Sequence, residues 1–96
     1  MQHLMLEIAQ TNLFKRQLKK CRKRGWDVAE LEAVVYLLQK QEELPAKYKD
    51  HALSGDRAGQ RDCHIMPDWI LIYAVREDVL ILQLLATGSH ADLSLS

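Results

Sequence analysis

Hydrophobic residues near the start of the chain occupy every second position, as they do in a strand with one buried face. Leu4, Leu6 and Ile8 follow this period, which predicts a half-buried strand. The spacing then becomes helical after Thr11 or Asn12, either of which can cap a helix by accepting a backbone N–H bond. The apolar stripe of this first helix consists of Phe14, Leu18 and Cys21.

A second helix is expected directly after the first. Gly25 can adopt the left-handed conformation that ends the first helix, and Asp27 is a suitable N-cap for the next. Apolar residues then recur with a helical period as far as Leu38. Pro45 disfavours helix in the residue before it, so this helix should fray near residues 41–42. Because the connection is so short, the two helices should form an antiparallel hairpin.

The second half of the chain has the pattern of a β-meander. Residues 45–59 are predicted as a loop, and three strands are expected after it, at Gln60–Met66, Trp69–Val75 and Val79–Ala86. The middle strand is apolar on both faces, as a central strand would be. The order strand–helix–helix–strand–strand–strand predicts an α+β fold with both helices packed on one face of the sheet, in a single domain over residues 1–96.

Composition is that of a small globular protein. The 96 residues suffice for one compact domain, and the hydrophobic share of 48% argues against disorder. No apolar run approaches the roughly 18 residues of a membrane span, and the first residues lack a basic segment. We therefore expect a cytoplasmic protein without a signal peptide. Cys21 and Cys63 follow no metal-binding or redox spacing, which favours two buried thiols.

Charge is balanced overall but not along the chain. Thirteen basic and thirteen acidic side chains give a formal net charge of zero, which argues against indiscriminate nucleic-acid binding. Seven of the basic residues nevertheless fall between positions 15 and 24, with no acid among them. This segment could contact phosphate groups, or it could simply be a solvated helix face. The candidate RNA contacts in it are Lys15, Lys19, Lys20, Arg22 and Lys23.

Three of the four histidines, His51, His64 and His90, lie in polar or turn-like stretches. Histidine gives and takes protons near neutral pH, so three histidines brought together would suit acid–base chemistry. Each one alone is better explained as a structural or surface residue. A zinc site that combines them with Asp68 is geometrically possible, but no pair has a recognisable ligand spacing. Strand alternation also places Cys63 and His64 on opposite faces, and we expect no metal.

Three longer motifs contain these histidines. They are Tyr48-Lys49-Asp50-His51-x-Leu53-x-Gly55, Arg61-Asp62-x-His64-Ile65-x-Pro67-Asp68-Trp69-x-Leu71-Ile72-Tyr73 and Thr87-Gly88-Ser89-His90-Ala91-Asp92-Leu93. In order and spacing they resemble the motifs of the YafQ family, bacterial toxins within the wider RelE/ParE superfamily. The resemblance covers nearly the whole chain, including the two-helix start, and it implies a small antiparallel sheet packed against two helices.

This resemblance implies the toxin of a type II toxin–antitoxin module, a ribosome-dependent endoribonuclease that cleaves mRNA in the ribosomal A site without a cofactor. The implied partners are a cognate antitoxin, the ribosome with its mRNA, and operator DNA through the antitoxin complex. The family's cleavage residues match His51, His64, Asp68 and His90. Further substrate contacts are expected at Arg61, Asp62, Trp69 and Ser94.

RNA cleavage of this kind requires two proton transfers. The 2′-hydroxyl loses a proton as it attacks the adjacent phosphate, and the departing 5′-oxygen gains one. The extra charge on the phosphate must also be stabilised. Our hypothesis makes His90 the general acid and Asp68 the general base, while His51 and His64 hold the phosphate or orient the nucleophile. His64 could instead serve as the base.

Two positions depart from the family pattern. Ser94 stands where the family usually has phenylalanine, and Ala86 where many relatives carry arginine. The first change removes a ring that could stack on a base, and the second removes a cation, so either could mark an attenuated toxin. The alternative is a non-catalytic homologue that still binds antitoxin or ribosome. A gyrase-directed relative of the ParE type is disfavoured, because it would not need the histidines.

Overall fold

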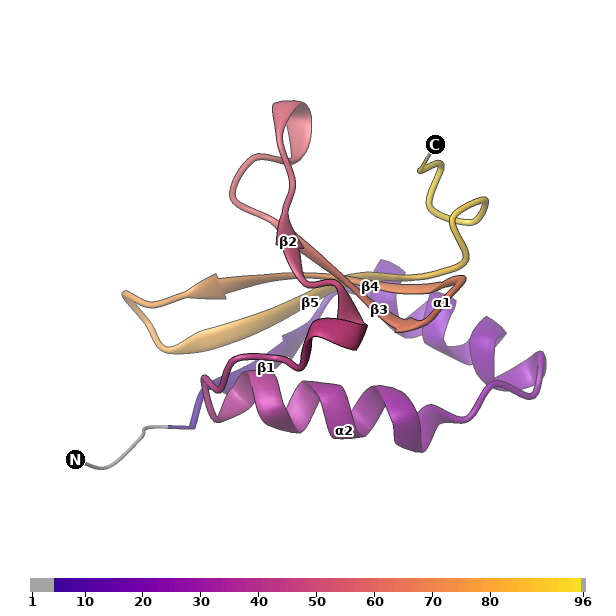
Figure 1. The fold of residues 1–96 in the computed structure, drawn as a ribbon, viewed down its shortest axis with the longest axis horizontal. Helices are drawn as coiled ribbons and strands as arrows, with labels where there is room; N and C mark the ends of the chain where they lie inside the picture. The colour runs from indigo at the N-terminus through magenta and orange to yellow at the C-terminus, as the bar shows by residue number, and fades with distance from the viewer. Residues whose placement is uncertain (1–4, 96) are drawn as a thin grey trace.

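A five-stranded sheet separates two helices on one face from a set of loops on the other (Figure 1). The computed structural model describes residues 5–95. The predicted α+β class, with both helices against one face of the sheet, is confirmed. No helix in the described part of the chain is long and apolar enough to cross a membrane. The elements are β1 (Glu7–Gln10), α1 (Asn12–Lys23), α2 (Val28–Gln39), the 3-10 turn η1 (Ala46–Tyr48), β2 (His51–Ala52), the 3-10 turn η2 (Gly55–Arg57), β3 (Arg61–Met66), β4 (Trp69–Arg76) and β5 (Ile81–Gly88).

Both helices are capped as the sequence predicts. The Thr11 hydroxyl accepts the N–H of Phe14 at 2.9 Å, and the Asp27 carboxylate accepts the N–H of Ala29 at 3.0 Å. Gly25 follows α1 with φ of +83°, a left-handed conformation that residues with a side chain rarely adopt. The chain therefore reverses within a few residues, and α2 runs back beneath the sheet (Figure 1).

The strands lie in the order β1-β5-β4-β3-β2. β3, β4 and β5 form the predicted antiparallel meander. β1 instead runs parallel to β5, with Glu7 opposite Ile81, so the sheet is mixed rather than antiparallel throughout. Parallel neighbours need a long connection between them, and here both helices and three strands of the sheet separate the two.

The first strand begins later than its alternating pattern predicts. Leu4 lies outside the described residues, and β1 starts at Glu7, where pairing with β5 begins. Leu6 is buried as expected, at 1% exposure, and lies just before the strand. Ile8 is 41% exposed, because β1 forms an edge of the sheet and is covered only in part.

Two further predictions for the strands were wrong. β5 runs from Ile81 to Gly88, two residues later at each end than predicted, because a four-residue turn fills positions 77–80. The predicted loop at 45–59 contains two 3-10 turns and a short edge strand, β2, which pairs with β3 through His51 opposite Asp62. A two-residue strand has too little alternation to be recognised from sequence.

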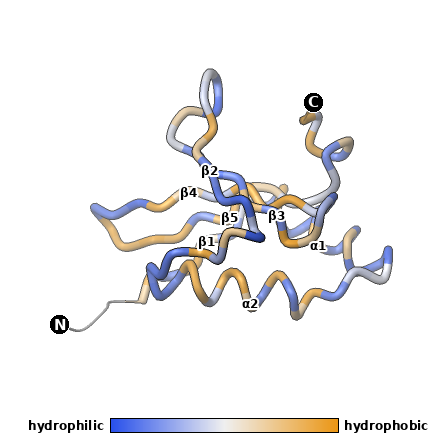
Figure 2. Tube along the Cα trace, viewed as in Figure 1, coloured by the Kyte–Doolittle hydropathy of each residue, from blue (hydrophilic) through white to orange (hydrophobic). Residues whose placement is uncertain are grey.

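Hydrophobic side chains fill both faces of the central strand β4. On the helix face, apolar residues of α1 and α2 pack against the sheet, and hydrophobic and hydrophilic positions alternate along α2 (Figure 2). On the opposite face a smaller cluster joins Ile70, Ile72, Ala86 and Leu93. The segment after β5 therefore folds back over the sheet, which places the residues around His90 above the ends of β3 and β4.

Candidate active site

The face of the sheet opposite the helices carries the predicted histidines. Along β3, Cys63 and Ile65 are buried in the cluster beneath the sheet, so Asp62 and His64 point to the other face. The turn after β5 brings His90 to the same face, where the His64 and His90 rings meet edge to face with centroids 5.4 Å apart. Two strands and a C-terminal turn thus assemble one polar cluster.

His90 and Asp68 form the tightest pair in this cluster. One oxygen of Asp68, at the tip of the β3–β4 hairpin, accepts the backbone N–H of His90 at 2.9 Å and lies 2.5 Å from His90 Nδ1. These two bonds, the backbone one first, lower the pKa of Asp68 below its usual range. Because Nδ1 faces the carboxylate, the second ring nitrogen, Nε2, is left to face a substrate.

A second carboxylate, Asp62, lies between the other two histidines. Its Oδ1 is 3.7 Å from His51 Nδ1 and 3.7 Å from His64 Nε2. Asp62 is 4% exposed, and within residues 5–95 this oxygen has no hydrogen-bond partner. A buried acceptor without a partner is costly, so a small closing movement of either histidine would be favourable. Asp62 was predicted as an RNA contact, but it is buried behind His51 and His64.

His51 is the most exposed of the three histidines. Its side chain is 52% exposed, and Nδ1 lies 2.8 Å from the carbonyl oxygen of Lys49. The preceding residue, Asp50, accepts the hydroxyl of buried Tyr73 at 2.5 Å and two N–H groups of Arg61 at 3.2 and 3.3 Å. Burial, and then this bond to Asp50, raises the pKa of Tyr73. The Arg61 guanidinium, predicted as an RNA contact, is therefore already paired.

Trp69 lies in the core, which differs from its predicted place as a substrate contact. It is 2% exposed, its ring stacks at a tilt on Trp26 with centroids 5.1 Å apart, and its Nε1 donates to the Thr87 hydroxyl at 2.9 Å. Thr87 in turn donates to the carbonyl of Ile70 at 2.8 Å. Trp69 therefore supports the end of β5 from below, and its ring is not open to a base.

The basic side chains predicted on the first helix are exposed along α1. Helix α1 packs against β5, and these side chains give its solvent-exposed surface a positive charge. Lys20 lines a small cavity together with Gln17, Thr87 and Asp92, beside the turn that carries His90. The exposed cations of this set are Lys15, Lys19, Lys20, Arg22 and Lys23.

Comparison with known proteins gives the same family as the motifs. The family described as "Bacterial toxin of type II toxin-antitoxin system, YafQ" matches residues 6–95. The chain belongs to the YafQ family. A relative from Escherichia coli K12, "mRNA interferase toxin YafQ", is 39% identical over 88 residues, which cover 91% of this chain and 94% of the relative. An mRNA interferase is an endoribonuclease, the class of enzyme that the motifs predict.

Solved structures of YafQ relatives share the fold. The toxin in the E. coli DinJ–YafQ toxin–antitoxin complex has a TM-score of 0.84 at 38% identity, with 93% of this chain and 97% of that chain covered. A metal-bound toxin from Helicobacter pylori has a TM-score of 0.88 at 38% identity, with 93% and 99% covered. In the described residues of the present chain, no three His, Cys, Asp or Glu side chains are grouped to hold a metal ion.

The two departures from the YafQ pattern lie in different surroundings. Ser94 is exposed with φ of +55° in the turn after His90, so a larger side chain there would project from the surface. Ala86 is 7% exposed and packs with Leu93 on the face that carries the histidines. The space above Ala86 is therefore filled by an apolar contact.

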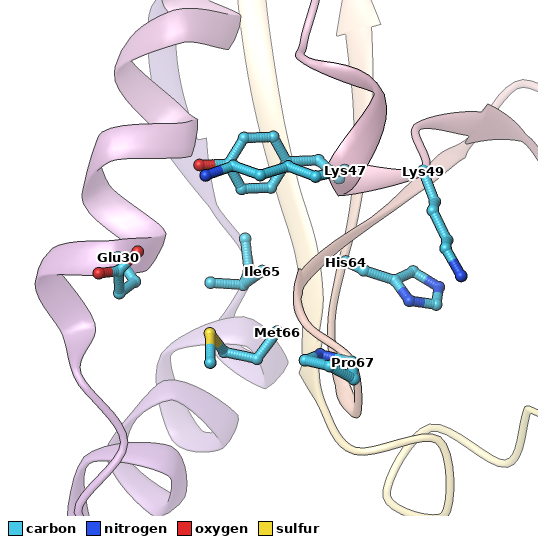
Figure 3. A pocket seen from close by; sticks show the side chains of 8 residues that line it. Glu30, Lys47, Lys49, His64, Ile65, Met66 and Pro67 are labelled. Carbon is cyan, nitrogen blue, oxygen red and sulfur yellow. The ribbon is translucent and has the colours of Figure 1, made fainter.

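Sequence reasoning missed a lysine beside His64. Lys47, Lys49 and His64 line one pocket, and Figure 3 shows the Lys49 side chain extending beside the imidazole, whereas the Lys47 side chain points to the other side. The Lys47 ammonium lies over the Tyr48 ring, 5.0 Å from its centroid. Lys49 lies between η1 and β2 and adopts φ of +49°. The Lys-Tyr-Lys-Asp-His run carried the signal for it. Since Arg61 is paired with Asp50, Lys49 is better placed for a phosphate.

Proposed function

We propose that this chain is the toxin of a type II toxin–antitoxin module and cleaves mRNA on the ribosome. The observation that carries the proposal is the Asp68–His90 pair, held by bonds of 2.5 and 2.9 Å beside the ring of His64. Two proton-transfer groups close to each other are what 2′-hydroxyl attack on a phosphate requires. The products would be a 2′,3′-cyclic phosphate and a 5′-hydroxyl, formed without a metal.

His90 is the general acid in this scheme. Asp68 holds Nδ1, so that a proton on Nε2 can be delivered to the departing 5′-oxygen. The same bonds argue against Asp68 as the general base, because they lower its pKa and so make the carboxylate a weaker proton acceptor. His64, with the Asp62 carboxylate behind it, is better placed to take the proton of the 2′-hydroxyl.

The remaining groups would stabilise charge on the phosphate. His51 and the Lys49 ammonium lie on the side of His64 that faces away from the core, where a phosphate could reach them. Positive groups held in place around a developing negative charge lower the activation barrier of cleavage, because they need no rearrangement during the reaction. They would take the place of the arginine that Ala86 does not supply.

The exposed cations of α1 would hold ribosomal RNA. Each phosphate contact releases counterions, so binding weakens linearly on a logarithmic salt scale, with a slope close to the number of contacts. Lys19→Gln should reduce that slope by about one in a ribosome-binding titration. The matched control is Lys40→Gln, because Lys40 is paired with Glu42 at 3.1 Å at the end of α2. An equal effect of the two substitutions would argue against the α1 contact.

The proposal also covers partners and location. A cognate antitoxin would neutralise the toxin, as the DinJ–YafQ complex suggests by similarity, and the pair would act on operator DNA through the antitoxin. The place of action would be the cytoplasm, where translating ribosomes are found.

The test is primer extension on purified ribosomes programmed with a defined mRNA. Wild-type protein should cut the mRNA in the A site, His64→Ala should cut it at least a hundredfold more slowly, and mRNA without ribosomes should stay intact. Ser94 favours the second candidate, a homologue that binds but does not cleave. Ribosome binding by the wild type without any cleavage would support that candidate and overturn the proposal.

A further inference from the structure

Arg24 differs from the other cations of the basic segment. It follows the last residue of α1, and its guanidinium binds both oxygens of Asp92, at 2.5 and 2.9 Å. Asp92 belongs to the turn that carries His90, which is far from α1 in the sequence. The paired guanidinium, and then the Ser89 N–H, hold the pKa of Asp92 well below its usual range. A cation already committed to a carboxylate in this way is poorly suited to bind RNA.

The partner of Arg24 closes the turn around His90. Asp92 Oδ2 accepts the backbone N–H of Ser89 at 2.8 Å, and the Ser89 hydroxyl accepts the backbone N–H of Asp92 at 3.0 Å. The turn also packs closely on the end of β5, since a Cβ placed on Gly88 would lie 2.8 Å from that of Asp92. His90 lies inside this reciprocal pair of bonds, so the conformation of the turn decides where its ring points.

A second bond ties the same segment to α1. Gln17 Oε1 accepts the backbone N–H of Thr87 at 3.0 Å. Residues 17 and 24 are seven positions apart, about two helical turns, and therefore lie on one side of α1. The helix thus holds the start of the His90 segment through Gln17 and its end through Arg24.

We propose that Arg24 is a positioning residue, whose ion pair with Asp92 holds the turn so that the His90 ring stays on Asp68. The inference rests on the proposed function for the role of His90, while the contact itself can be tested without cleavage. It also removes Arg24 from the set of cations available to ribosomal RNA.

An exposed ion pair can also be without consequence, because most such pairs contribute little to stability. The chain offers a matched control for this possibility. Arg76 binds both oxygens of Asp78 at 3.2 and 2.9 Å in the β4–β5 turn, also at the surface. That turn is remote from the histidines, so loss of this pair should affect neither the position of His90 nor cleavage.

The experiment is a double-substitution cycle measured as single-turnover cleavage on programmed ribosomes. Arg24→Gln should lower the maximal rate about tenfold, because displacements near 1 Å can cost up to a hundredfold. The protein concentration for half-maximal rate should change less than twofold. Asp92→Asn should have a similar effect, the double variant should be no slower than the worse single one, and Arg24→Lys should recover part of the rate. Arg76→Gln should match the wild type.

Two results would overturn the proposal. If Arg24→Gln weakens ribosome binding and reduces its salt dependence while the maximal rate is unchanged, Arg24 is an RNA contact. If the Arg24 and Asp92 effects simply add, the pair does not act as a unit. If the wild type does not cleave, the proposed function fails. The positioning role of Arg24 is then tested separately by NMR relaxation of the free protein. Arg24→Gln should then increase fast motion of the 89–92 amides relative to Arg76→Gln, and unchanged motion would overturn the inference.

Discussion

The two halves of the candidate site are built differently. Around His90, every link is a formed bond: Asp68 holds the ring, and the Arg24–Asp92 pair holds the turn. Around His64, the buried Asp62 oxygen lies 3.7 Å from both neighbouring histidines and has no bonding partner in the described chain. The proposed general acid, His90, is therefore already held in place in the free protein. The base half would become organised only when a substrate draws the histidines onto Asp62, as is common for catalytic groups in unbound enzymes.

The largest expected effect separates the two exposed histidines. His90→Ala should lower single-turnover cleavage by about 10²–10⁴-fold, the range for loss of a positioned proton-transfer group. His51→Ala should lower it only about tenfold, because His51 is 52% exposed and would share phosphate binding with Lys49. If both substitutions lowered cleavage equally, the bonded His90–Asp68 pair would contribute no more to catalysis than the exposed His51.

Asp62→Asn should lower cleavage by an intermediate amount, about tenfold to a hundredfold, since an uncharged amide would hold His64 less well. The melting temperature should not fall, because the substitution removes a buried charge whose oxygen lacks a partner. Asp56→Asn, an exposed acid in η2, is the control and should change neither quantity. A strongly destabilised Asp62→Asn would contradict the view that this carboxylate is unsatisfied in the free protein.

Ser94→Phe should increase cleavage, because a ring beside His90 could stack on a substrate base for roughly 1–3 kcal/mol. The gain should be at the lower end, about fivefold, since φ at this position is +55° and a bulky residue there adds strain. Single-turnover cleavage of one mRNA by both proteins measures it. An unchanged rate would exclude position 94 from substrate binding in this chain.

The smallest effect concerns the Asp68 carboxyl group. Its pKa should lie below the ordinary value of about 3.9 and return towards it in His90→Ala, as followed by carboxyl-carbon NMR. Since the folded-state pKa is lowered, the ionised group stabilises the fold above its unfolded pKa. That contribution disappears as pH falls through the folded value. A pKa that is the same in both proteins would mean that the His90–Asp68 bonds are not maintained in solution.

Periodicity predicted the helices, their caps and the meander, because each depends on local spacing. It did not predict the parallel partner of β1 or the strand β2. Both depend on pairing between distant segments, and β2 spans only two residues. The predicted start of β5 was wrong by two residues because the turn at 77–80 has no glycine or proline to mark it.

The sequence motifs singled out the histidines that gather on this face, but not the side chains that hold them in place. His51, His64, Asp68 and His90 do gather on one face, as strand alternation and the C-terminal turn require. The motifs did not distinguish contact from support: Trp69 matched the family pattern yet is buried, 2% exposed, against Trp26. Which cations are free could not be read from sequence either. That depends on ion pairs between segments far apart in the chain, such as those of Arg24 and Arg61.

The central claim is that His90 donates the proton to the leaving group, and a substrate with sulfur in place of the scissile 5′-oxygen tests it directly. A thiolate leaves without needing a proton, so the general acid becomes dispensable. On programmed ribosomes carrying this mRNA, His90→Ala should recover nearly wild-type single-turnover cleavage, whereas His64→Ala should remain slow. Equal loss of cleavage by His90→Ala on the oxygen and sulfur substrates would contradict the account.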